Sequence, residues 1–144
     1  MNIPSKVLKE LIELGHTGHE CVPPSLRDES VAWWTLVCGK GPWIEAVRKL
    51  GPEEISALIQ GLVLYCRASG RGIGGSVSPV IVLYQIVLEK APHLEPALTR
   101  WVVAHRTNSY EPFGTSNDGG ATTYADFVKR RMLRVQRAKA NEGI

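Results

Sequence analysis

The sequence predicts an all-α protein, a compact bundle of six to seven helices that ends in a basic amphipathic helix. Apolar residues recur at the 3.6-residue spacing of a helix in most segments. Prolines and glycines stand where helices begin and end, and no neighbouring segments alternate as partner strands would. The length of 144 residues and the 44% hydrophobic content are typical of one globular domain. We therefore expect a single helical domain over residues 1–144, with the basic helix at 121–140 and a tail at 141–144.

The first three helices are predicted from short apolar stripes and from the residues that bound them. Residues 5–14 carry apolar side chains on one helical face, and Gly15 is expected to end this helix. Ser25, followed three residues later by Asp28, is predicted to cap the second helix, because the acid can reach back to the exposed amides. A short third helix is expected to follow Pro42.

The next three helices have clearer boundaries. Pro52 stands at the first position of the fourth helix, with two acids in the first turn, and Gly70 is expected to end this helix in a left-handed turn. Ser78 is the predicted N-cap of residues 79–90, an apolar segment that is expected to form a buried central helix rather than a strand. A sixth helix is predicted from Pro92.

The formal net charge of +3 is distributed unevenly along the chain. Residues 1–121 carry 11 basic and 12 acidic side chains, whereas residues 122–144 carry six basic and two acidic ones, a net charge of +4. Arg130, Arg134 and Arg137 form a stripe on the predicted last helix, and guanidinium groups suit phosphates because they make planar, bidentate contacts. The predicted nucleic-acid contacts are Lys129, Arg130, Arg131, Arg134, Arg137 and Lys139.

The cysteines indicate a reducing compartment. Three cysteines at irregular spacing do not make a disulfide framework, and two of them lie inside apolar runs. The first residues are too polar for a secretory signal, and no apolar run approaches the length of a membrane span. We therefore expect a cytoplasmic protein with reduced cysteines and no contact with a membrane.

Two motifs that resemble chemical sites are better explained as structure. His16, His19 and Cys21 lie close together, and Cys38 offers a fourth zinc ligand, yet this spacing matches no standard zinc motif. A polar turn between helices is the favoured interpretation, so neither a metal nor another cofactor is expected.

The glycine-rich stretch satisfies G-x-G-x-x-G at Gly70, Gly72 and Gly75. A helix precedes it where the dinucleotide fingerprint needs a strand, and Ser76 stands where a P-loop needs lysine. A connection between helices is therefore favoured, and phosphate binding near Arg71 stays open as the alternative.

Residues 108–116 form a candidate interaction loop, in which Tyr110 and Phe113 are the anchors. Aromatic residues dominate binding hot spots, although the same two side chains also suit a plug that ties the loop to the bundle. Trp33 and Trp34 cannot share one face of a helix, so one of them is expected to be exposed or at an interface.

The function predicted from these features is non-enzymatic binding of a macromolecule. No activated nucleophile or pair of carboxylates can be argued from the spacing, so an enzyme is not expected. Nucleic acid or a ribonucleoprotein, bound through the basic helix, is the first choice of partner. The alternative is a small bacterial or phage adaptor, inhibitor or assembly subunit, which binds an acidic protein surface through the same helix and the 108–116 loop. The basic stripe also suits a solvated helix face, and the chain is compatible with a homo-oligomer.

Overall fold

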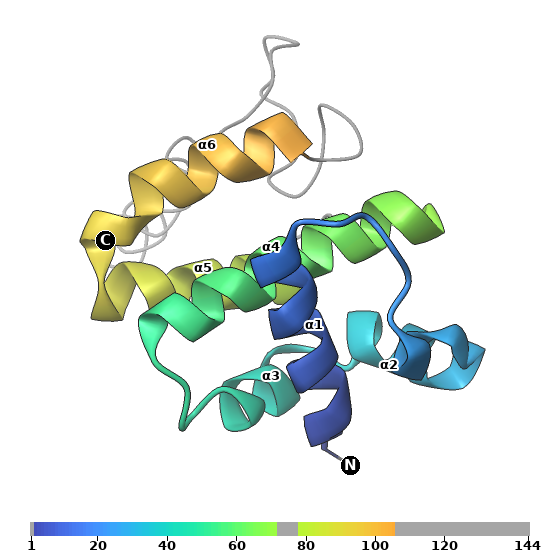
Figure 1. The fold of residues 1–144 in the computed structure, drawn as a ribbon. Coiled ribbons are helices and arrows are strands. Elements are labelled where there is room, and N and C mark those ends of the chain that lie inside the picture. Colours follow the sequence, from blue (N-terminus) through green and yellow to red (C-terminus); the bar gives the residue numbers. More distant parts are fainter. Residues whose placement is uncertain (1, 72–77, 106–144) are drawn as a thin grey trace, which may run out of the picture.

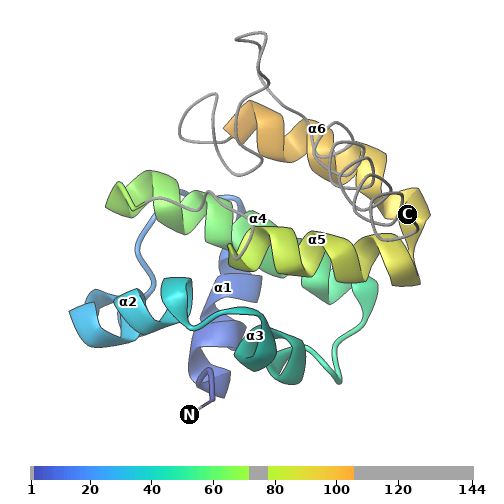
Figure 2. The same cartoon turned by 180° about the vertical axis from the view of Figure 1, so that it is seen from behind.

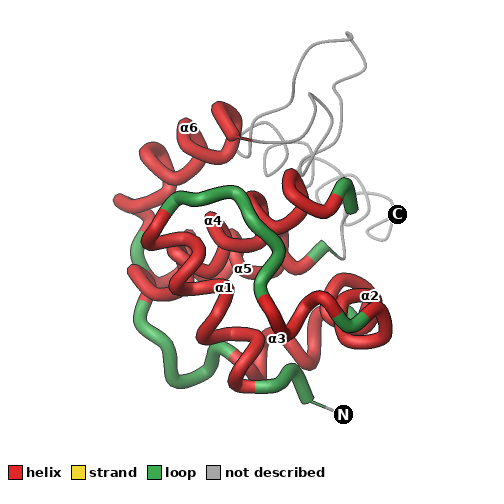
Figure 3. The backbone as a smooth tube through the Cα atoms, turned by 45° about the vertical axis from the view of Figure 1, so that its right-hand side comes forward, coloured by secondary structure: helices red, strands yellow, loops and turns green. Residues whose placement is uncertain are grey.

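The structure is a computed structural model that describes residues 2–71 and 78–105 (Figure 1). These residues form six α-helices and two short 3-10 helices and contain no strand (Figure 3). The predicted all-α bundle is therefore confirmed. The predicted basic helix, residues 121–140, lies outside the described residues.

The helices follow one another through short connections. The α-helices are α1 (Ser5–Thr17), α2 (Glu29–Val37), α3 (Lys40–Ala46), α4 (Pro52–Ser69), α5 (Pro79–Lys90) and α6 (Glu95–His105). The 3-10 helices η1 (Pro24–Arg27) and η2 (Pro92–Leu94) precede α2 and α6.

Helices α4 and α5 lie at the centre of the bundle. α4 is buried on nearly all sides between Ile55 and Cys66, and α5 is buried from Pro79 to Tyr84 and again at Val87. α1 crosses α4, and α6 lies on the opposite side of the central pair from α2 and α3 (Figures 1 and 2). The prediction that residues 79–90 form a buried helix is confirmed.

The boundaries of the central helices follow from local chemistry, as the sequence predicted. α4 begins with proline at its first position, and the Gly51 amide donates to a Glu54 carboxylate oxygen at 3.4 Å. The helix ends at Gly70, which has a φ of 74° and donates its amide to the Cys66 carbonyl at 2.9 Å. At the start of α5, the Ser78 hydroxyl accepts from the Val80 amide at 3.3 Å.

Two glycines bring the backbones of α1 and α4 into direct contact. A Cβ placed on Gly15 would lie 1.9 Å from the Ala57 carbonyl oxygen, and one on Gly61 would lie 1.9 Å from the Leu11 carbonyl oxygen. The contact is reciprocal, because on each helix the glycine follows the contacted residue by four positions, which is one turn. Only glycine fits at these positions while the helices are this close.

The prediction that Gly15 ends the first helix is therefore wrong. α1 continues to Thr17, and it ends at Gly18, which has a φ of 74°. Gly15 does not end α1 but allows it to pack closely against α4.

Three other predicted helix starts are shifted. Ser25 is not the cap of the second helix, because its amide and its hydroxyl donate to the two carboxylate oxygens of Glu10, the first at 2.9 Å. α3 begins at Lys40, so Pro42 lies within its first turn, where a missing amide breaks no helical bond. Pro92 opens η2, and α6 begins only at Glu95.

Candidate interaction surface

The residues predicted to bind a partner lie outside the described part of the chain. This is so for all the predicted phosphate contacts and for the interaction loop, whose anchors are Tyr110 and Phe113. Both assignments stay predictions. The described residues instead present an apolar surface on α2, which the sequence indicated only in part.

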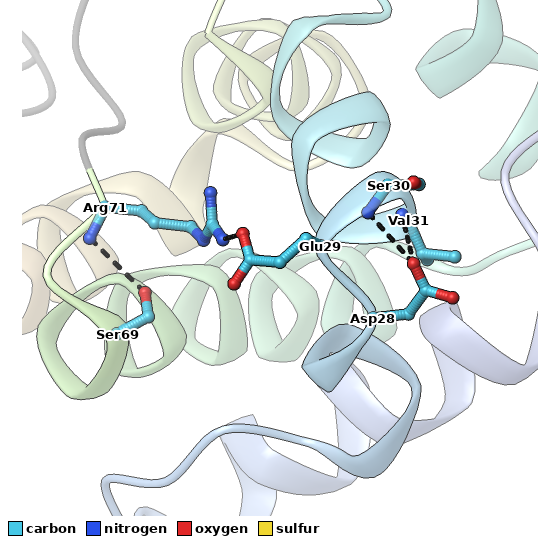
Figure 4. A network of polar contacts seen from close by, with 6 residues as sticks. All are labelled: Asp28, Glu29, Ser30, Val31, Ser69 and Arg71. Carbon is cyan, nitrogen blue, oxygen red and sulfur yellow. Dashed lines mark hydrogen bonds and ion pairs between the residues drawn. The ribbon is translucent and has the colours of Figure 1, made fainter.

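Helix α2 is held in a fixed rotation by its ends and by its inner face. Asp28 caps it, since its carboxylate accepts from the Ser30 amide at 2.9 Å and the Val31 amide at 3.3 Å (Figure 4). Ala32 and Thr35 are buried on the inner side, and the indole of Trp43 donates to the Thr35 carbonyl at 3.0 Å. This anchoring decides which side chains of α2 point outward.

The outward side of α2, here called the α2 face, consists of Trp33 and Val37. Their exposed fractions are 60% and 50%, the largest among the large hydrophobic residues that the structure describes. The two residues are one turn apart and so lie on the same side of the helix. A hollow of about 620 Å³ opens beside Trp33 and is lined by Glu29, Ser30, Trp33, Trp34 and Arg71.

Two residues that line this hollow form an ion pair. Arg71, which follows the end of α4, pairs with Glu29 in the first turn of α2 (Figure 4). The Arg71 amide also donates to the Ser69 hydroxyl at 3.3 Å, which holds the backbone that carries the guanidinium. The hydrogen bond to Glu29 is the main cause that raises the pKa of Arg71, and the ion pair connects the first turn of α2 with the end of α4.

The two adjacent tryptophans have different surroundings. Trp33 is exposed, whereas Trp34 is partly buried and its indole nitrogen has no hydrogen-bond partner among the described residues. The sequence predicted that one of the two would be exposed or at an interface, and the exposed one is Trp33. The sequence did not indicate which of the two it would be.

The candidate metal ligands are not brought together. His16, His19 and Cys21 are exposed, and Cys38 is partly buried, which raises the pKa of its thiol. Across residues 2–71 and 78–105, no three His, Cys, Asp or Glu side chains are grouped closely enough to hold a metal ion.

His105, at the end of α6, is held by contacts with neighbouring residues. Its ring stacks on Trp101 with the centroids 4.0 Å apart, and its Nδ1 lies 2.8 Å from the Trp101 carbonyl oxygen. Its own carbonyl accepts from Arg67 at 3.0 Å.

The described body carries no net charge. It contains ten basic and ten acidic side chains, so the +3 of the whole chain comes from the remaining residues. Within the described ranges, three of the five arginines lie in ion pairs: Arg48 with Glu45 at 2.8 Å, Arg67 with Glu20 at 3.4 Å, and Arg71 with Glu29.

Comparison with protein-family models, with curated proteins and with solved structures gave no match to this chain. None of the helices in the described ranges is long and apolar enough to span a membrane. The function must therefore be argued from the chain's own charges and surfaces.

Proposed function

We propose that the protein binds a macromolecule without catalysing a reaction, and that its partner is nucleic acid or a ribonucleoprotein held by the basic segment 122–144. The observation that carries this proposal is the distribution of charge. A neutral helical body is joined to a segment with six basic and two acidic side chains. Clustered cations on one segment make the electrostatic footprint of a phosphate-binding protein.

The ion pairs of the body support the same assignment. Arg48, Arg67 and Arg71 each have a carboxylate partner, so their charges are partly compensated before any ligand arrives. Arg130, Arg134 and Arg137, three arginines within eight residues of the sequence, are a denser source of positive charge. Phosphate contacts of this kind give affinity without base specificity.

The test is the salt dependence of binding to a labelled DNA duplex. Each neutralised phosphate releases counterions, so with roughly three to five contacts the affinity should fall by about one and a half to three decades between about 50 and 200 mM salt. Arg134→Glu should weaken binding to all duplex sequences alike and lower the salt slope.

A matched control separates a local contact from a change in total charge. Lys6→Glu alters the net charge by the same amount, at an exposed position in the first turn of α1 where an acid is favourable for the helix. It should leave binding within about twofold, since long-range interactions between exposed charges are screened. No binding of the wild-type protein at about 50 mM salt, or equal effects of the two variants, would refute the nucleic-acid proposal.

A protein partner is the second candidate, and the exposed Trp33 favours it. An aromatic side chain beside an apolar neighbour and an arginine is typical of a binding hot spot. In this candidate function, Trp33 and Val37 contact the apolar part of a partner whose acidic surface meets the basic segment.

Affinity capture with and without nuclease distinguishes the two candidates. A nucleic-acid function predicts that capture of partners depends on intact nucleic acid and does not depend on Trp33. An adaptor function predicts that the wild-type protein still captures its partner protein after nuclease treatment. The Trp33→Ala variant should not capture that partner. If the wild-type protein and the Trp33→Ala variant capture the same partner after nuclease treatment, the partner does not bind through the α2 face.

A further inference from the structure

A groove between α3 and α5 shares no lining residue with the hollow beside Trp33. Its volume is about 320 Å³, and its lining residues come from α3, from the turn that follows α3, and from α5. α3 and α5 pack against each other (Figure 2). They are Lys40, Ile44, Val47, Arg48, Val82, Gln85, Ile86, Glu89 and Lys90.

The floor and wall of the groove are aliphatic. Val47 and Val82 are 1% and 3% exposed and form a floor that belongs to the core. Ile44 is 38% exposed and Ile86 is partly buried, so both present apolar surface toward the opening. A concave apolar strip of this kind can take side chains from one face of an amphipathic helix.

The rim of the groove is mainly basic. Lys40, Arg48 and Lys90 line it together with a single acid, Glu89. Arg48 is paired with Glu45, which is not a lining residue, at 2.8 Å. Lys40 and Lys90 have no ion-pair partner among the described residues, so these two ammonium groups are available to a ligand.

The spacing of the rim fits an extended partner better than a small molecule. Lys40 and Ile44 lie one turn apart on α3, and Lys90 at the end of α5 lines the same groove, so each of the two helices supplies a cation that is unpaired among the described residues, beside the apolar strip. A partner that packs on Ile44 and Ile86 therefore has these two ammonium groups near it, Lys40 from α3 and Lys90 from α5. The complement of this groove is a large apolar side chain with acidic residues on both sides.

We infer that the α3/α5 groove, defined by the nine lining residues, binds an acidic amphipathic segment of a partner protein. Apolar side chains of the segment pack on Ile44 and Ile86, and its carboxylates approach Lys40 and Lys90. Charge complementarity determines that the partner is acidic and speeds its association, while the apolar floor provides buried contact area. This binding does not require the basic segment 122–144 or the α2 face.

The test begins with selection of peptides from a displayed random library on the full-length protein. The bound peptides are then synthesised with a fluorescent label and measured by anisotropy. The expected peptides carry large apolar residues flanked by Asp or Glu. Their affinity for the wild-type protein should fall as the salt concentration rises, because the contacts to the lysines are exposed.

Two groove variants and one control variant complete the test. Ile44→Asp should weaken binding of the selected peptides at least tenfold, because it places a carboxylate on the apolar wall. The double variant Lys40→Glu, Lys90→Glu should weaken binding at least tenfold and remove most of the salt dependence, and it covers the case in which Ile44→Asp does not fold. Val37→Asp makes the same kind of change on the α2 face and should leave binding within twofold.

Three results would overturn the inference. The first is a selection that yields no peptide preferring the wild-type protein over both groove variants. The second is a selected set that is basic or uncharged. The third is a loss of binding by Val37→Asp as large as that by Ile44→Asp, with circular dichroism confirming that both variants are folded.

Discussion

Replacement of Gly61 by alanine tests the backbone contact on which the α1–α4 packing depends. The new Cβ would lie 1.9 Å from the carbonyl oxygen of Leu11 and 2.7 Å from its carbonyl carbon. Both atoms belong to the backbone of a helix, so neither can rotate away. The helices must therefore move apart at this point.

The cost can be worked from the displacement. A close C···O contact needs about 3.3 Å, so the backbones must separate by roughly 1.4 Å. Overpacking of a core costs about 1–3 kcal/mol and occasionally more, and contact with rigid backbone belongs at the upper end. Alanine regains about 1 kcal/mol of helix propensity over glycine. The expected net loss is therefore about 2 kcal/mol or more, a drop in Tm of about 4–8 °C for a chain of this size.

Urea and thermal unfolding, followed by circular dichroism, measure this loss. Gly41→Ala is the control, since Gly41 lies in the first turn of α3 and nothing lies within 4 Å of the position of its Cβ. We expect the control not to destabilise the protein, because alanine favours a helix over glycine. By reciprocity, Gly15→Ala should behave like Gly61→Ala. A Gly61→Ala protein as stable as wild type would refute the close crossing of α1 and α4.

Three further predictions concern the cap of α2 and two titratable groups. Asp28→Ala removes the acceptor for two amides at the start of α2 and should cost about 1 kcal/mol in urea unfolding, whereas Asp28→Asn should cost much less. Iodoacetamide should modify the exposed Cys21 faster than Cys38, because burial raises the pKa of the Cys38 thiol and leaves less thiolate near neutral pH. Equal rates by mass spectrometry would contradict this difference. Burial also raises the pKa of the Tyr65 phenol. The neutral phenol therefore stabilises the folded state below its unfolded pKa of about 10, and this stabilisation is lost as the pH rises through the folded pKa. Between about pH 9 and 11, the Tm of Tyr65→Phe should therefore fall less with rising pH than the Tm of the wild-type protein. Superimposable profiles of Tm against pH would contradict this prediction.

The elements that the sequence predicted correctly are those with local determinants. Pro52 and Gly70 bound α4, and Ser78 opens α5, as their positions in the sequence indicate. A proline without an amide, a glycine that accepts a positive φ and a hydroxyl beside free amides act within one helical turn. The sequence window around such a residue therefore contains most of the information that fixes the boundary.

The incorrect predictions concern residues whose partners are distant in the sequence. Gly15 carries a local signal for helix termination, but its role is set by Ala57, 42 positions away, against which it packs. Ser25 carries a local signal for capping, but Glu10 binds its amide and hydroxyl, and Asp28 takes the cap instead. In both cases a tertiary contact prevailed over a local preference.

The sequence by itself determined the all-α fold class, the limits of the central helices and the concentration of positive charge in residues 122–144. These features depend on composition, helical periodicity and caps, which are properties of neighbouring residues. Only the tertiary structure decided that Trp33 rather than Trp34 is exposed, and that Ile44 of α3 shares a groove with Ile86 of α5. Exposure and concavity depend on how segments pack in three dimensions, and the two isoleucines of the groove are 42 positions apart in the sequence.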